Sequence, residues 1–243
     1  MSEVLNRISS SLESLNLEDR LVLIADLFPG QVVFSTSFSK EDQLITERIV
    51  KRNLDVEIFT LDTLKLFPET RELWKETERK YGLTIKGYKP EKEAVDNYVK
   101  QHGEEGYYKD ISLRKECCYI RKIAPLKKAL AGKEIWLSGV RASHSNARSN
   151  KSVVEYDTAL ELYKIYPLLE ISDQELEEEI ISKQIPVNKL YSKNFLSIGC
   201  APCTRAVQPG EDARAGRWWW EQDEVQECGL HVKNGKLVRS KKG

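Results

Sequence analysis

Short apolar runs alternate with longer segments of helical periodicity along most of the chain. The first 28 residues have helical spacing, and four β-rich runs follow, each bounded by turn residues or polar residues. The pattern predicts strands at 31–35, 55–60, 84–88 and 134–138. It predicts helices within 1–28 and at 41–51, 69–81, 91–101, 112–130 and 172–183. Because strands and helices alternate, we expect an α/β fold with a mainly parallel sheet flanked by helices.

The ends of several helices are marked by capping residues. Asn16 is suited to cap a helix whose first turn contains Glu18 and Asp19. Ser172 and Glu175 have the spacing of a capping box. We expect one domain, divided into N-terminal helices (1–28), an α/β core (29–193) and an irregular C-terminal segment (194–243) rich in Gly, Pro, Arg and Cys.

Polar residues follow three of the predicted strands, where a parallel sheet binds ligands beyond its carboxyl ends. Small hydroxyl residues before a helix suit phosphate, and the arginine fork suits phosphate or sulfate. An ordinary capped loop and solvated arginines remain alternatives, since the loop is not a Walker A motif. The predicted substrate-binding residues are Ser35, Thr36, Ser37, Phe38, Ser39, Asp62, Thr63, Arg141 and Arg148.

Composition narrows the class of protein further. The chain has 243 residues, with Lys+Arg 38 and Asp+Glu 38, so its net charge of zero gives no electrostatic footprint for nucleic acid. No apolar run approaches the ~18 residues of a membrane span, and the N-terminus does not resemble a signal peptide. We therefore expect a cytoplasmic protein that does not enter a membrane, and the sequence leaves a homo-oligomer open.

The five cysteines form a pair, a second pair and a single residue. Four thiolates can close one metal or iron–sulfur site, which leaves one cysteine as a candidate nucleophile. Cys117 and Cys118 are adjacent, and adjacent helical side chains point about 100° apart. A [4Fe–4S] cube has four separate iron corners, so the set with Cys200 and Cys203 favours this cluster over zinc. A zinc site or simple buried thiols remain alternatives.

The single cysteine is Cys228, followed by Gly229 and His231. His231 and nearby arginines could lower the pKa of this thiol and raise its thiolate fraction. Arg214 and Arg217 precede a tryptophan triplet, which is typical of a core or an interface. The two arginines fit either an anion site or the surface.

Several motifs together resemble the assimilatory sulfonucleotide reductases of the iron–sulfur type, and most closely the adenylyl-sulfate (APS) reductases. The motifs are Ser35-Thr36-Ser37-Phe38 with Glu41-Asp42, Leu61-Asp62-Thr63, Leu66-Phe67-Pro68-Glu69-Thr70, Cys117-Cys118-Tyr119-Ile120-Arg121-Lys122, Gly139-Val140-Arg141 through Arg148, Ile198-Gly199-Cys200-Ala201-Pro202-Cys203-Thr204-Arg205, Gly216-Arg217-Trp218-Trp219-Trp220-Glu221 and Glu227-Cys228-Gly229-Leu230-His231. The sequence departs from the family pattern at Leu64, at Ser39-Lys40 and at Ala142, Ser143 and His144.

The resemblance implies an adenine-nucleotide α-hydrolase-like (Rossmann-like) fold. It implies a [4Fe–4S] cluster on the four paired cysteines and attack of Cys228 on the sulfur of APS, with reduced thioredoxin or a similar dithiol releasing sulfite. It places Lys122, Arg214, Arg217 and His231 around the sulfate. The phosphate would lie at Arg148 and the loop 35–39, and the nucleoside near Asp62.

Three alternatives remain at this point. The substrate could be 3′-phosphoadenylyl sulfate (PAPS), or both nucleotides, with Lys40 or Lys65 adding positive charge. An iron–sulfur tRNA-thiolating enzyme of the PP-loop class would also combine a nucleotide loop with cysteines, although the loop lacks the Ser-Gly-Gly-x-Asp-Ser pattern. A zinc-containing adapter without catalytic activity is the third.

Overall fold

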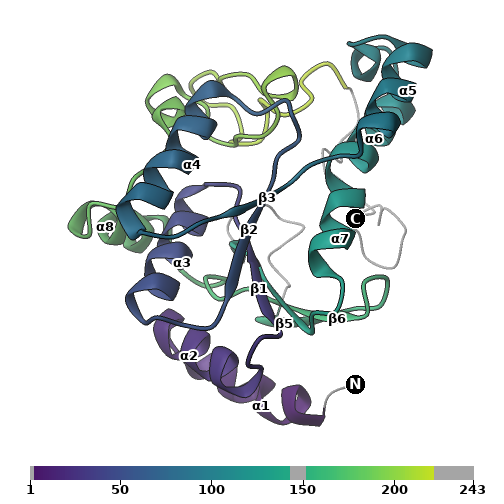
Figure 1. Ribbon diagram of the computed structural model, residues 1–243. Helices are drawn as coiled ribbons and strands as arrows, with labels where there is room; N and C mark the ends of the chain where they lie inside the picture. Colours follow the sequence, from purple (N-terminus) through teal and green to yellow (C-terminus); the bar gives the residue numbers. More distant parts are fainter. Residues whose placement is uncertain (1–2, 143–151, 222–243) are drawn as a thin grey trace, which may run out of the picture. The chain divides into compact units, whose positions relative to one another are not determined.

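The computed structural model describes residues 3–142 and 152–221. These residues form an α/β fold around a six-stranded sheet ordered β3-β2-β1-β4-β6-β5 (Figure 1). The strands are β1 (Val32–Ser35), β2 (Glu57–Leu61), β3 (Lys86–Tyr88), β4 (Ile135–Leu137), β5 (Val154–Asp157) and β6 (Leu162–Ile165). The helices are α1 (Glu3–Ser14), α2 (Leu17–Leu27), α3 (Lys40–Lys51), α4 (Pro68–Tyr81), α5 (Lys92–His102), α6 (Ile111–Cys118), α7 (Ala124–Leu130) and α8 (Asp173–Ser182).

The centre of the sheet is parallel, as the alternating pattern predicts. β1 pairs in parallel with β2 and with β4, and β4 pairs in parallel with β6. The antiparallel hairpin of β5 and β6 is an addition that the sequence pattern did not predict. Its strands are four residues long and interrupted by charged residues, among them Lys164, whose ammonium pairs with Asp157 at 2.5 Å.

The chain divides into two compact units, neither of which is a continuous segment. The first comprises Met1–Phe59, Glu76–Ile85 and Gly132–Val187, and the second comprises Thr60–Lys75, Lys86–Ala131 and Asn188–Gly243. The predicted single domain with boundaries after residues 28 and 193 stays a prediction.

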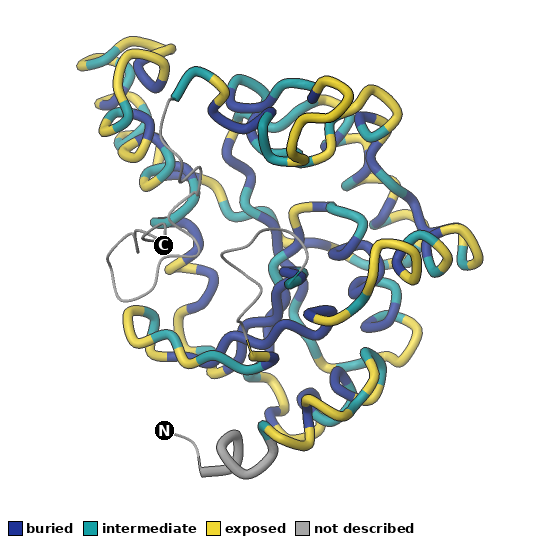
Figure 2. Tube along the Cα trace, turned by 180° about the vertical axis from the view of Figure 1, so that it is seen from behind, coloured by how far each residue is buried: buried dark blue, intermediate teal, exposed yellow. Residues whose placement is uncertain are grey.

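In the first unit, capping sets the ends of the helices and apolar residues fill the core. The Asn16 side chain accepts a hydrogen bond from the Asp19 amide at 3.0 Å, and both bonds of the Ser172–Glu175 capping box are present. Both capping predictions are therefore confirmed. Helix α3 packs against α2 and α8. Figure 2 shows the buried strands running through the interior and exposed residues along the outer turns of the helices.

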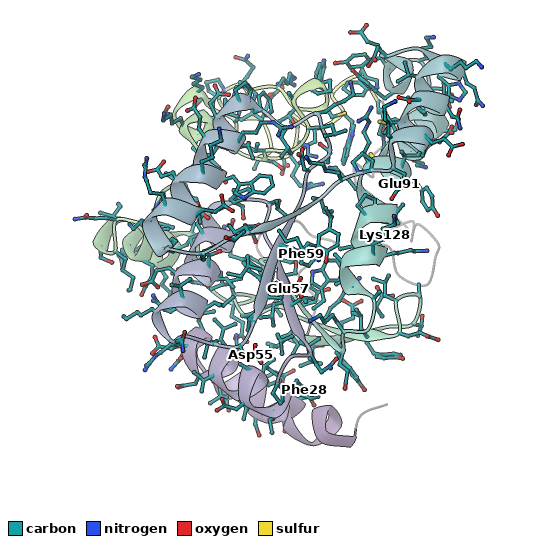
Figure 3. All side chains as sticks on the ribbon, viewed as in Figure 1. Phe28, Asp55, Glu57, Phe59, Glu91 and Lys128 are labelled. Carbon is teal, nitrogen blue, oxygen red and sulfur yellow. The ribbon has the colours of Figure 1, made fainter. Side chains whose placement is uncertain are left out.

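In the second unit, α5, α6 and α7 lie in one column (Figure 1). A π-helix, η2 (Tyr119–Ile123), joins α6 to α7. Lys128 of α7 forms an ion pair with Glu91, the residue that precedes α5 (Figure 3). From residue 189 to residue 221, the described end of the chain, the unit has short helical turns, including η5 (Lys189–Lys193) and η6 (Ala201–Cys203). No helix in the described part of the chain is long and apolar enough to cross a membrane.

Candidate functional site

Four cysteines from two distant segments of the second unit line one small pocket, which we call the cysteine pocket. Two come from the end of α6 and two from the turn η6. The lining residues are Lys65, Tyr107, Arg114, Cys117, Cys118, Arg121, Lys122, Cys200, Pro202 and Cys203. All four cysteines are thiols in this structure. The structure therefore brings together the four residues that the sequence grouped as ligands.

Cys117 and Cys118 lie at the junction between the α-helix α6 and a π-helix. α6 begins at the N-cap Asp110, whose carboxylate accepts a hydrogen bond from the Ser112 amide at 2.6 Å, and ends at Cys118. The π-helix η2 follows directly. A π-turn is wider than an α-turn and is frequent at functional sites. Both Cys117 and Cys118 line the pocket at this junction.

The second pair is fixed by the backbone of the loop after β2. The Ala201 amide donates to the Lys65 carbonyl at 2.8 Å, and the Cys203 amide donates to the Cys200 carbonyl at 3.0 Å. The Cys200 thiol lies 3.3 Å from the Thr63 hydroxyl oxygen, and the Arg121 guanidinium donates to the Thr63 carbonyl at 3.0 Å. Thr63, predicted to bind substrate, therefore contacts Cys200 in this structure.

Burial disfavours the ionised form of two thiols in the pocket. It raises the pKa of the Cys117 thiol, and it raises that of Cys203 to about 12 together with the charges of Cys200 and Cys118. The charges of Arg121 and Lys122 act in the opposite direction on Cys117 and Cys203, respectively. Nearby positive charge therefore favours the thiolate form of these two cysteines, and burial favours the thiol.

The donor set fits an iron–sulfur cluster. Four cysteines are the ligands of a [4Fe–4S] cube, which binds each sulfur at a different iron atom. In the described part of the chain, no group of three or more His, Cys, Asp or Glu side chains, the four cysteines included, is placed to hold a metal ion.

A buried ion pair lies beside the pocket. The Arg114 guanidinium donates to both carboxylate oxygens of Glu221, at 2.7 and 2.8 Å, and lies over the ring of Trp218 at 4.6 Å. The Trp218 ring is 1% exposed and packs in one core cluster with three of the cysteines, whereas Trp219 is 40% exposed. The tryptophan triplet thus contributes both to a core and to the surface.

Two of the predicted sulfate-binding cations lie in the second unit near these residues. Arg217 is buried, with its guanidinium 4.8 Å from the Trp218 ring centroid and 3.4 Å from the Ser197 hydroxyl. Gly199 permits this packing, because a Cβ there would overlap the Arg217 guanidinium. Lys122 lines the cysteine pocket. The third cation, Arg214, is partly buried in the turn before Arg217, where its amide donates to the Asp212 carboxylate.

The hydroxyl-rich loop between β1 and α3 lies in the first unit and is held by its own side chains. The Ser37 amide and hydroxyl donate to Asp42 at 2.6 and 2.7 Å, and the Phe38 amide donates to the Thr36 hydroxyl at 3.0 Å. Ser39 is the N-cap of α3, and Ser35 accepts from the Trp136 indole at 2.7 Å. The loop therefore ends at the positive N-terminus of a helix, as an anion site requires.

Asp42 is the buried carboxylate beneath this loop. Burial raises its pKa to about 6, although hydrogen bonds from Ser37 and Ser39 oppose the increase. The loop after β4 passes so close that a Cβ at Gly139 would overlap the Asp42 carboxylate. The loop after β4 thus lies against the first turn of α3, which follows the hydroxyl-rich loop.

Arg141, predicted to bind substrate, is engaged by protein groups. Its guanidinium donates to Glu41 at 2.9 Å and to the Ile171 carbonyl at 3.3 Å, and lies 2.7 Å from Asp173. In this structure Arg141 joins three segments of the first unit.

The remaining predicted residues fall into two groups. Asp62, in the second unit, is buried and forms an ion pair with Arg71 at 3.0 Å. Arg148, Cys228 and His231 lie outside the described residues. Neither Arg114 nor Glu221 was predicted from the sequence to have a role in the site, although Glu221 ends the motif that begins at Gly216. The position of Arg114, three residues before Cys117 on one helix face, is a signal that could have identified it.

Comparison with known families defines the class of protein. Residues 31–206 match the family model of the phosphoadenosine phosphosulfate reductase domain. The chain belongs to this family. The match covers both the hydroxyl-rich loop and the four cysteines of the pocket.

Two relatives with the same name are similar to this chain over most of its length. The chain is 47% identical to the adenosine 5′-phosphosulfate reductase of Rhizobium meliloti (strain 1021) over 224 residues, which is 92% of this chain and 84% of the relative. It is 46% identical to the protein of the same name from Allochromatium vinosum, over 82% of this chain and 78% of the relative.

A solved structure agrees with the family assignment. The PAPS reductase of Candida auris, in a phosphate complex, is similar with a TM-score of 0.71 and 25% identity, over 85% of this chain and 98% of that chain.

Proposed function

We propose that this protein reduces APS to sulfite and AMP in sulfate assimilation, with a thioredoxin-type dithiol as the electron donor. The observation that carries the proposal is the cysteine pocket: four thiols converge in a chain of the sulfonucleotide reductase family. Relatives over 40% identical are named APS reductases, which supports APS as the substrate. The proposed location is the cytoplasm, where thiols are kept reduced.

The proposed cofactor is a [4Fe–4S] cluster held by Cys117, Cys118, Cys200 and Cys203. Buried thiols with raised pKa values beside several cations are a donor set that suits such a cluster. When bound, the cluster would supply a fixed charge and structural order, since two thiols of the dithiol provide both electrons for sulfite formation.

In the proposed mechanism, the Cys228 thiolate attacks the sulfur of APS. A sulfur–sulfur bond forms, and the sulfur–oxygen bond to the phosphate breaks, so AMP leaves with the electron pair. A thiolate of the dithiol then attacks the Cys228 sulfur, and sulfite leaves with the electron pair of the sulfur–sulfur bond. The second thiol of the dithiol releases Cys228 from the mixed disulfide. The dithiol is oxidised by two electrons, and sulfate sulfur is reduced to sulfite.

Positive side chains are required because the nucleophile and the substrate are both anionic. We assign Lys122, Arg214, Arg217 and His231 to the sulfate. The N-terminus of α3 with the loop 35–39 supports a phosphate site. Arg148 belongs to the same proposed phosphate site.

Lys40 and Lys65 are the two lysines that could bind the 3′-phosphate of PAPS, and their contacts in this structure support APS as the substrate. Lys40 forms an ion pair with Glu177. Lys65 lies 3.6 Å from Glu104 and lines the cysteine pocket. Both ammonium groups thus have carboxylate partners, which favours the substrate without the additional phosphate.

The intermediate on Cys228 tests the proposal. Anaerobic protein incubated with APS and no dithiol should release one AMP per active chain. Mass spectrometry should find one SO₃ group on the peptide with Cys228. Addition of reduced thioredoxin should release that group as sulfite. AMP release without a modified Cys228 would contradict the mechanism.

A further inference from the structure

The Arg114–Glu221 ion pair is buried to an unusual degree for two charged side chains. Both side chains are 2% exposed, and the contact is bidentate. A comparable bidentate pair, Arg205–Glu211, has distances of 2.8 and 2.9 Å but side chains that are 33% and 32% exposed. Two pairs of closely similar geometry in the second unit therefore differ in burial, since Arg114–Glu221 lies beside the cysteines and Arg205–Glu211 lies at the surface. This makes the exposed pair a matched control.

Arg114 contacts the cysteine pocket and the end of the described chain at the same time. Its side chain lines the pocket. The same guanidinium donates to both carboxylate oxygens of Glu221, the last described residue. Arg114 therefore connects the pocket lining, which includes Cys118, with residues 218–221.

Backbone hydrogen bonds link Cys203 of the pocket to residues 218–221. The Trp218 amide donates to the Cys203 carbonyl at 3.2 Å, and the Glu221 amide donates to the Trp218 carbonyl at 2.9 Å. Cys228 follows Glu221 by seven residues.

We infer that Arg114 and Glu221 are positioning residues that hold residues 218–221 against the cysteine pocket, so that cluster binding and the order of these residues, which precede Cys228 in the sequence, are coupled. The inference rests on the proposed function for its catalytic consequence. The coupling itself is a property of the folded chain. Because coupling between two sites is reciprocal, weakening the ion pair must also weaken retention of the cluster.

Amide hydrogen exchange of the iron-loaded protein tests the coupling without turnover. In the wild type, the amides of Trp218 and Glu221 should exchange slowly, and removal of iron with a chelator should accelerate them. Glu221→Gln should accelerate both amides at least about tenfold, the lower range for a charged hydrogen bond. The variant should also lose iron faster and show a smaller effect of iron removal. Glu211→Gln should match the wild type in all three measurements.

The catalytic consequence is measured separately. With APS, Glu221→Gln should lower the rate of Cys228 modification at saturating substrate and leave KM unchanged, since the nucleotide loop is intact. Wild-type exchange and iron retention in Glu221→Gln would overturn the inference. Exchange in the wild type that does not respond to iron would overturn it as well. If Glu221→Gln does not fold, Arg114→Lys keeps the charge without the planar fork, and the same outcomes apply. Absence of sulfite formation by the wild type would refute the proposed function and leave the exchange result standing.

Discussion

Asp42 gives the protein a pH dependence that its sequence alone does not reveal. Its carboxyl group is buried beneath the loop that precedes α3, and burial raises its pKa from 3.8 to about 6. The folded state therefore binds this proton more tightly than the unfolded state does. It follows that the contribution of Asp42 to stability falls as the pH rises from about 4 to about 6. Asp42→Asn keeps an oxygen that can accept the hydrogen bonds from Ser37 and removes the charge.

The magnitude follows from the two pKa values. Their difference corresponds to about 3 kcal/mol at neutral pH. Between pH 5 and pH 7.5 the contribution of Asp42 to the free energy of unfolding falls by about 1.4 kcal/mol. For a chain of this size, we expect the Tm difference between Asp42→Asn and wild type to grow by about 3–6 °C over that range.

Thermal unfolding of the iron-loaded proteins at a fixed scan rate measures this difference. Glu175→Gln is the control, because hydrogen bonds from Ser172 lower the pKa of this carboxyl. Its contribution is present above the unfolded pKa of 4.5 and is lost only as the pH falls below it. The control should therefore show a constant Tm difference between pH 5 and pH 7.5. A constant difference for Asp42→Asn as well would refute the burial argument.

Four further substitutions test the site. Cys228→Ser should abolish sulfite formation while iron per chain stays at the wild-type value, and iron loss in this variant would contradict the division of the five cysteines. Lys122→Ala should lower kcat/KM for APS about 100-fold with an unchanged circular dichroism spectrum, and unchanged kinetics would remove Lys122 from the site. Thr63→Val removes the hydroxyl that lies 3.3 Å from the Cys200 sulfur, so a chelator should extract iron faster, and wild-type extraction would show that the contact is unimportant. Gly139→Ala places a Cβ against Asp42 and should cost about 1–3 kcal/mol, measured as a lower Tm; an unchanged Tm would mean that the loops can separate.

The regular part of the fold was predictable because its residues carry local signals. Buried apolar runs predicted β1 and β4, and side-chain caps predicted the starts of α2 and α8. The hairpin of β5 and β6 was not predictable in this way. Its strands are short and contain charged residues, and its pairing depends on the neighbouring β4.

The candidate site was predictable where covalent chemistry limits the choice of residue. Cysteine spacing grouped four residues that line one pocket. The role of Arg141 could not be read from sequence, because an arginine after a strand fits phosphate, solvent or carboxylate equally well. Only the fold shows that Glu41 and Asp173 lie against it. Arg114 and Glu221 are 107 residues apart in sequence, so their pairing also required the structure.

The most direct test of the central proposal is sulfite release by anaerobically purified protein with reduced thioredoxin, offered APS or PAPS, with iron counted in the same sample. We predict a preference for APS with about four irons per chain, as a cube held by four cysteines requires. A preference for PAPS at the same iron content would contradict the assigned substrate. No sulfite from either nucleotide, in protein that contains its full iron, would contradict the proposed function.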